Sequence, residues 1–363
     1  MSERSAIRRE VLTLYAVSVA ICILLFLSQY ALPFIYQNSV ALAAMVFIFL
    51  PLEVLRKRNI DAARFGIHYQ QLWRNLGWGL LLALCVFPLY LAGHHLWQTT
   101  MFNAHFEPRR QSFHLFPREL DGWPRISRRD QGLFVWKTYD HAYFWLPQPQ
   151  KQAATLRITG DREPGDFQAI VPVNGRFRTI RQPAITTKVE GATLIIRSSL
   201  VRFGGRVAID RLDRLRIALD QAGEVESPVR IGGSRTLVSP PIDVQRRYAW
   251  LLYFILIQFA LVAVPEELFY RGYVQSRLAQ LDRRTWTVLG AEIGPSILYT
   301  SLLFALGHFL VDWNPARLAV FFPSLLFGWL RQRTGSIGAA VVFHALSNLI
   351  SELSARCYLV KLS

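Results

Sequence analysis

The sequence predicts an all-α polytopic membrane bundle of about seven spans, with a β-rich extramembrane domain inserted in it. Three observations indicate this fold class. The 363 residues are 52% hydrophobic, the apolar residues are gathered in blocks of membrane length, and Lys and Arg flank these blocks. The net charge of +16 does not indicate a nucleic-acid partner, because no basic helix or RNA-binding motif accompanies it. It fits cytoplasmic loops and contact with membrane lipid.

The first region, residues 1–97, contains three predicted spans, at 11–36, 39–55 and 76–97. Each is long enough, or nearly so, to cross about 30 Å of hydrocarbon as a helix. Positive charge marks cytoplasmic loops, so the flanking residues place the N-terminus in the cytoplasm. We expect a bacterial inner membrane. The flanking basic residues are Arg4, Arg8, Arg9, Arg56, Lys57, Arg58 and Arg74.

The second region, residues 98–247, is expected to be a β-rich soluble domain on the outer face. Two alternating stretches around Asn174-Gly175 predict a β-hairpin, and residues 186–199 predict another that turns at Glu190-Gly191. Residues 206–223 fit either strands or a strand followed by a short helix. Since the three cysteines do not form a disulfide or CxxC pattern, this domain must be stabilised by its core; Cys22, Cys85 and Cys357 are interpreted as packing residues.

The third region, residues 248–363, contains four further predicted spans and the residues expected to carry chemistry. The spans are 248–272, 293–311, 316–330 and 336–353, of which two are short enough to be tilted or re-entrant. An ionisable or amide side chain inside a membrane span costs free energy, so such residues are functional candidates. They are Glu266, Glu267, Arg271, His308, His344 and Asn348.

Helical spacing separates the two adjacent glutamates. Glu267 and Arg271 lie one turn apart, so they can form a carboxylate–guanidinium pair, and Glu266 then remains as the unpaired carboxylate. A carboxylate in a dry site can act as a general base on water, with a histidine beside it. A second histidine and an amide can supply hydrogen bonds to an oxyanion, the remaining requirement for hydrolysing an amide bond without a covalent intermediate.

The order Glu266-Glu267-x-x-x-Arg271, Phe304-x-x-x-His308, His344-x-x-x-Asn348 resembles the three-motif signature of the CPBP family, the CAAX prenyl endopeptidases and bacteriocin-processing proteins. The resemblance covers about residues 250–350. It implies an intramembrane glutamic endopeptidase in which Glu266 and His308 activate water. It further implies that His344 and Asn348 stabilise the oxyanion, while Glu267 and Arg271 support the helix geometry and Phe304 packs beside them.

The implied substrate is a protein or peptide: a C-terminal sorting tail, a prenylated peptide or a leader peptide. No cofactor is expected. A zinc site of Glu266, His308 and His344 is the disfavoured alternative, because no HExxH-type ligand pair supports it. A non-catalytic membrane scaffold, whose β-domain recognises exported proteins, is the alternative function. Straight spans would also place Glu266 and His308 at different depths, with Pro265 as a candidate kink.

Overall fold

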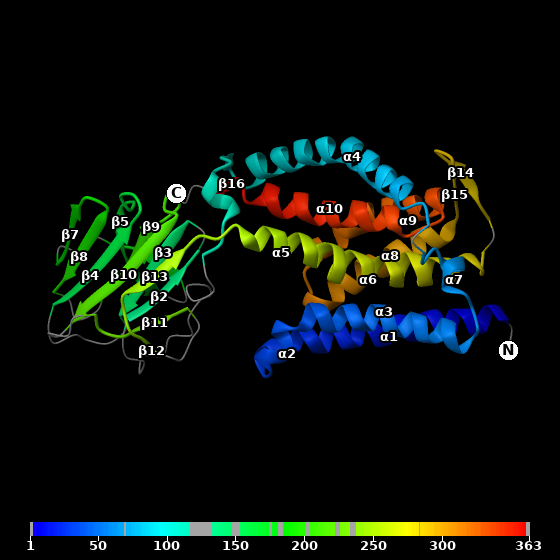
Figure 1. Ribbon diagram of the computed structural model, residues 1–363, viewed down its shortest axis with the longest axis horizontal. Coiled ribbons are helices and arrows are strands. Elements are labelled where there is room, and N and C mark those ends of the chain that lie inside the picture. Colours follow the sequence, from blue (N-terminus) through cyan, green and yellow to red (C-terminus); the bar gives the residue numbers. More distant parts are fainter. Residues whose placement is uncertain are drawn as a thin grey trace. The chain divides into compact units, whose positions relative to one another are not determined.

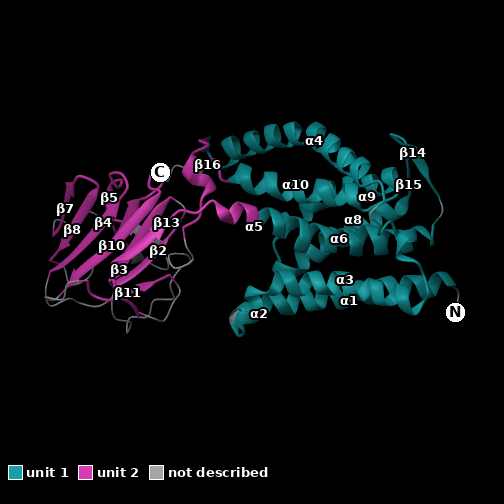
Figure 2. Ribbon diagram, viewed as in Figure 1, with its two compact units in different colours: residues 1–105, 253–355, 360–363 teal, residues 106–252, 356–359 magenta. Residues whose placement is uncertain are grey.

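The computed structural model divides the chain into two compact units, coloured separately in Figure 2. It describes residues 3–68, 70–116, 133–138, 140–146, 153–173, 176–180, 184–199, 203–221, 226–232, 237–282 and 284–360. Unit 1 is residues 1–105, 253–355 and 360–363, and unit 2 is residues 106–252 and 356–359. The N-terminal and C-terminal membrane regions, which we predicted as two separate regions, thus belong to one compact unit.

Unit 1 is helical (Figure 1). Five helices in the described part of the chain are long and apolar enough to cross a membrane: Glu3–Tyr30, Ser39–Lys57, Leu72–Met101, Ala249–Ala279 and Pro295–Asp312. The protein is therefore an integral membrane protein. The helices are α1 (Glu3–Leu27), α2 (Pro33–Gln37), α3 (Ser39–Lys57), α4 (Leu72–Met101), α5 (Ala249–Ile257), α6 (Val264–Glu267), α7 (Gln275–Ala279), α8 (Pro295–Asp312), α9 (Phe321–Thr334) and α10 (Gly338–Ala355).

Two predicted spans correspond to shorter or less apolar helices. The segments 316–330 and 336–353 contain α9 and α10, and neither is among the five, so the count of seven spans is not established. The helix of the first predicted span, 11–36, begins and ends earlier than expected, at Glu3 and Tyr30. It stops before Pro33, because a residue that precedes proline is disfavoured in helical conformation, and Leu32 adopts φ −130° and ψ 71°.

The helix that carries the two glutamates is continuous from Ala249 to Ala279. Pro265 does not break it; instead α6 lies between two π-helical segments, Gln258–Ala263 and Leu268–Val274. Proline removes one backbone donor, and wider π turns accommodate such a defect without ending the helix. The helix continues well beyond its apolar run, so Glu266 lies near its middle, and the expected difference in depth from His308 disappears.

The interior of unit 1 is aromatic. Phe269, Tyr270, Tyr273, Phe304 and Phe343 are all buried in one cluster with residues of α1, α4 and α9. Rings from different helices contact one another edge to face, as Tyr270 and Phe304 do at a centroid distance of 4.9 Å. This packing fixes the helices that carry the polar residues described below.

Unit 2 is a two-layer β-sandwich whose core is formed by the inward-facing residues of both sheets. The sheet orders are β13-β10-β4-β8-β7 and β12-β11-β2-β3-β9-β5-β6. The strands are β2 (Leu133–Lys137), β3 (His141–Leu146), β4 (Ala154–Gly160), β5 (Phe167–Val173), β6 (Arg176–Thr179), β7 (Ile185–Glu190), β8 (Thr193–Ser198), β9 (Phe203–Ala208), β10 (Arg214–Gln221), β11 (Val229–Ile231), β12 (Leu237–Val238) and β13 (Ile242–Gln245). Two short pairs, β1 (Ala104–Phe106) with β16 (Tyr358–Val360) and β14 (Trp286–Val288) with β15 (Ala291–Ile293), lie outside these sheets.

Both predicted hairpins are present as antiparallel pairs, β5–β6 and β7–β8. The predicted turn at Asn174-Gly175 lies outside the described residues. In the second hairpin Glu190 pairs with Thr193, so the turn is Gly191-Ala192, and Gly191 has a positive φ of 60°. The ambiguous segment 206–223 includes the end of β9 and all of β10, and its described residues, 206–221, contain no helix.

Candidate active site

Three helices of unit 1 bring the motif residues together. Glu266 and Glu267 lie on α6, His308 on α8 and His344 on α10. The shortest side-chain contacts among these residues range from 2.8 Å to 3.9 Å. The seven residues predicted from the sequence are therefore neighbours in one site: Glu266, Glu267, Arg271, Phe304, His308, His344 and Asn348.

The inner part of the site is a buried ion pair, in which Glu267 Oε2 and Arg271 Nε have no hydrogen bond among the described residues. Arg271 Nη1 donates to Glu267 Oε1 at 3.1 Å, and both side chains are completely buried. Arg271 Nη2 donates to Ser324 Oγ at 2.6 Å, and the guanidinium lies 4.4 Å above the ring of Phe304. This pair therefore joins the helix of the glutamates to α8 and α9, and its charges face protein on every described side.

His344 is joined to this inner pair rather than standing apart with Asn348. Its Nδ1 lies 2.8 Å from Glu267 Oε1. A carboxylate accepts, so Nδ1 carries the proton, and in the neutral ring Nε2 presents a lone pair. Glu267 thus orients a histidine as well as holding Arg271.

Glu266 differs from its neighbour in having no such partner. Its Oε2 lies 3.9 Å from His308 Nε2 and 3.9 Å from His344 Nε2, and this buried oxygen has no hydrogen bond among the described residues. Both gaps exceed a direct hydrogen bond and match a bridging water. His308 Nδ1 lies 2.9 Å from the backbone oxygen of Phe304, which can only accept. The Nε2 of neutral His308 therefore also presents a lone pair.

The tautomers have a chemical consequence. Glu266 Oε2 lies 3.9 Å from each of two further acceptors, the Nε2 atoms of His308 and His344, and none of the three is a donor. A water molecule placed between them would donate both of its hydrogens and leave its oxygen lone pairs free. This is the arrangement that a general-base mechanism requires.

Asn348 lies one turn beyond His344. Its Nδ2 donates to Gln258 Oε1 at 2.7 Å, and both side chains line a cavity that also contains Glu266, His308 and His344. This cavity has a volume of about 510 Å³ and is bounded mainly by the helix of the glutamates, α9 and α10. It brings a hydrogen-bond donor to the same space as the three acceptors.

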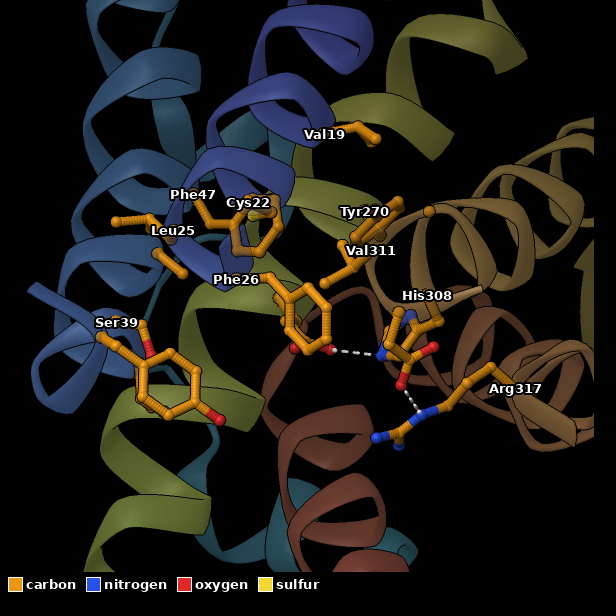
Figure 3. Close-up of a pocket in the computed structure, with 16 residues that line it drawn as sticks. Val19, Cys22, Leu25, Phe26, Ser39, Phe47, Tyr270, His308, Val311 and Arg317 are labelled. Atoms are coloured by element: carbon orange, nitrogen blue, oxygen red, sulfur yellow. Dashed lines mark hydrogen bonds and ion pairs between the residues drawn. The ribbon is translucent and has the colours of Figure 1, made fainter. Parts of the chain in front are cut away.

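Figure 3 shows a second cavity, of about 430 Å³. Glu266 and His308 line both this cavity and the first. The second cavity is bounded by α1, α2, α3 and α8, and Cys22 and Tyr270 lie in its wall. Arg317 lines both cavities and pairs through Nε with Asp312 at 3.0 Å. Glu266 and His308 are therefore reached from two sides of the bundle.

Sequence reasoning missed two contributors, Gln258 and Ser324. Gln258 had a visible signal, since it is the one amide in the apolar run 249–263. Ser324 had none, because a serine in an apolar helix is common and its contact with Arg271 depends on how α9 packs.

Among the described residues, no group of three or more His, Cys, Asp and Glu side chains is arranged to hold a metal ion. Tetrahedral zinc with bonds of about 2.1 Å would bring its ligand atoms to roughly 3.4 Å of one another. The two separations at Glu266 are 3.9 Å, longer than this value.

Residues 248–350 match a family model described as Rce1-like, type II CAAX prenyl endopeptidase Rce1-like. The match contains all three motifs and confirms the resemblance predicted from them. Because the matched family is a protease family, the match supports a protease whose substrate is a protein or peptide. No curated protein and no solved structure was found to match the chain.

Proposed function

We propose that this integral membrane protein is an intramembrane glutamic-type endopeptidase in which Glu266 is the general base. The observation that supports this role is its unpartnered buried Oε2, which faces two imidazole lone pairs at 3.9 Å. A buried carboxylate oxygen without a donor is unfavourable, and water supplies the missing hydrogen bond.

In the proposed reaction, water held between Glu266, His308 and His344 attacks the carbonyl carbon of the scissile peptide bond. One water proton moves to Glu266 as the new C–O bond forms, and the carbonyl electron pair becomes the oxyanion. Asn348 donates to this oxyanion from Nδ2, and His344 donates from Nε2 when it carries a proton. The C–N bond then breaks, and the proton is returned to the leaving nitrogen, which departs as an amine.

The reaction so written requires no metal ion, and we propose metal-free chemistry. Glu267 and Arg271 hold α6, His344 and α9 in register, and Phe304 packs between the histidines. We further propose that the N-terminus is cytoplasmic in a bacterial inner membrane and that the substrate is a membrane-associated or exported protein. Its cleaved segment would be a C-terminal sorting tail, a lipidated C-terminus or a leader peptide.

The test compares protein termini by mass spectrometry in cells that contain the wild type, Glu266→Gln or Glu352→Gln. Glu352 lines the same cavity as Glu266 but lies outside the acceptor cluster, so its variant is the matched control for loss of one carboxylate. We expect the wild type and Glu352→Gln to produce the same cleaved termini and Glu266→Gln to accumulate the uncut protein. Identical termini in all three would contradict a protease and favour a scaffold.

Stability provides an independent measurement. Glu266→Gln replaces an unpartnered buried carboxylate with a neutral amide, so its Tm in detergent should equal or exceed that of the wild type. Loss of cleavage together with a clearly lower Tm would mean that Glu266 supports the fold instead. Resistance of cleavage to zinc chelators is expected, and inhibition that added zinc reverses would contradict the metal-free mechanism.

A further inference from the structure

Gln258 is a polar side chain in a segment where polarity is unfavourable. It lies in the run 249–263, among apolar and aromatic residues of a membrane helix. Such residues persist in membranes where they hydrogen-bond or line a water-accessible cavity. Gln258 does both, since it contacts Asn348 and lines the cavity that contains Glu266.

The local helix geometry turns Gln258 towards the site. Residues eight apart in an uninterrupted α-helix lie about 80° apart around the axis. The π-helical segment Gln258–Ala263 intervenes between Gln258 and Glu266 and reduces the rotation per residue. The two side chains consequently reach the same cavity although they are two turns apart.

The contact with Asn348 has a defined polarity. Asn348 Nδ2 donates one hydrogen to Gln258 Oε1 at 2.7 Å, which leaves the second Nδ2 hydrogen for another acceptor. Rotation of the Asn348 amide by 180° would replace this donor with Oδ1, an acceptor that repels an oxyanion. With Gln258 Oε1 as its acceptor, the Asn348 amide takes the orientation that presents Nδ2.

We propose that Gln258 is a positioning residue that holds the Asn348 amide with Nδ2 directed at the oxyanion of the tetrahedral intermediate. This inference rests on the proposed endopeptidase activity and adds a residue to it that lies outside the three motifs. Gln258 acts only through Asn348, so it is expected to affect the chemical step and not the binding of the substrate.

The experiment uses a quenched fluorescent peptide that spans the cleavage site found in the comparison of the wild type with Glu266→Gln. The variants are Gln258→Met, which keeps the length of the side chain but has only a weak acceptor, Gln258→Glu, which keeps a strong acceptor, Asn348→Ala, and the double variant Gln258→Met/Asn348→Ala. Purified full-length protein in detergent micelles gives kcat and KM, and Tm reports folding.

We expect Asn348→Ala to lower kcat about 100-fold and Gln258→Met about tenfold, with KM changed less than about threefold, since removing an oxyanion donor affects the transition state. Gln258→Glu should keep kcat within about threefold of the wild type. The double variant should match Asn348→Ala, because Gln258 has nothing to orient once the amide is gone.

Three results would overturn the inference while leaving the protease intact: wild-type kcat in Gln258→Met, equal damage in Gln258→Glu and Gln258→Met, or defects that multiply in the double variant. Equal damage would mean that Gln258 acts as donor, and multiplication would mean a general structural role. Cleavage by Glu266→Gln at the wild-type rate would instead overturn the proposed function, and this inference with it.

Discussion

Unit 1 contains two clusters built around buried glutamates, and they differ in how their oxygens are occupied. Glu10 on α1 accepts from Tyr273 Oη at 2.5 Å and from Arg277 Nε at 2.8 Å, and it also pairs with Arg58 at the end of α3. Glu266 has two imidazole nitrogens at 3.9 Å. The Oε2 atoms of Glu10 and Glu266 are both buried without a hydrogen bond in the described part of the chain, but Glu10 Oε2 faces the guanidinium of Arg58 and Glu266 Oε2 faces the imidazoles. One cluster is surrounded by donors and the other by acceptors.

On the basis of this difference we assign a structural role to Glu10, and we propose a chemical role for Glu266. Donors around Glu10 join α1, α3 and α7, so this carboxylate is engaged by side chains that hold the helices together. Acceptors around Glu266 leave room for a proton-donating molecule. Burial alone therefore does not distinguish the two glutamates, whereas the polarity of their neighbours does, and on this difference we base the proposal that Glu266 is the general base.

The largest expected effect comes from breaking the inner pair of the site. Arg271→Met leaves the buried Glu267 with only His344 as a described partner and should cost about 3–5 kcal/mol of folding free energy, since removing one member of a buried pair strands the other charge. Thermal unfolding in detergent measures the loss as a lower Tm.

The double variant Glu267→Gln/Arg271→Met is the control for this prediction. It removes both charges together, so it should recover part of the Tm that Arg271→Met loses. A double variant that is less stable than either single variant would show that the two residues act independently, and would remove the basis for assigning Glu267 a supporting role.

The second prediction concerns the Glu10 cluster. Glu10→Gln keeps an acceptor for Tyr273 but loses the charge that faces two arginines, and should destabilise the protein by about 1–3 kcal/mol. Cleavage per folded molecule should remain at the wild-type rate. If the rate falls as far as in Glu266→Gln, the contrast between the clusters is wrong.

The sequence predicted the membrane class and the proximity of Glu267 to Arg271, because both depend on local patterns. Runs of apolar residues determine helices, and i, i+4 spacing places Glu267 beside Arg271, as the 3.1 Å contact shows. The link between His344 and Glu267 could not be predicted, since it depends on how α10 packs against α6.

The predictions were wrong or undecided where the end of an apolar run does not coincide with the end of a helix, or where pairing with distant strands decides the structure. The helix of Glu266 runs to Ala279 although its apolar character ends earlier, because Arg271 and Gln275 are buried against protein and not exposed to lipid. Residues 206–223 alternate weakly, and only pairing with neighbouring strands decides that β10 is a strand. Local propensity does not predict such pairing between strands that are distant in the sequence.

The third prediction uses a buried histidine in unit 2 as a contrast with those of the site. His114 packs against Tyr248 and faces Asp213 at 3.6 Å, with Arg246 and Arg110 nearby, and neither ring nitrogen has a hydrogen bond among the described residues. Burial lowers the pKa of His114 to about 4, although Asp213 opposes this shift.

Because the folded pKa lies below the unfolded value of about 6.5, stability is complete above pH 6.5 and declines as the pH falls towards 4. Between pH 8 and pH 5 this group should account for at most about 2 kcal/mol of the loss. His114→Phe should flatten this part of the profile, measured as Tm against pH. An unchanged slope would mean that His114 is not the titrating group.

The smallest expected effect comes from a single hydroxyl. Tyr273→Phe removes one donor to Glu10, while Arg58 and Arg277 remain, so the loss should be about 1 kcal/mol with no change in cleavage rate. Tyr270→Phe is the matched stability control, because the Tyr270 hydroxyl makes no hydrogen bond within the described residues. Equal Tm losses in the two variants would indicate that Glu10 gains nothing specific from Tyr273. A larger Tm loss in Tyr273→Phe would support the interpretation that each donor to Glu10 contributes a small part of the stability of this structural cluster.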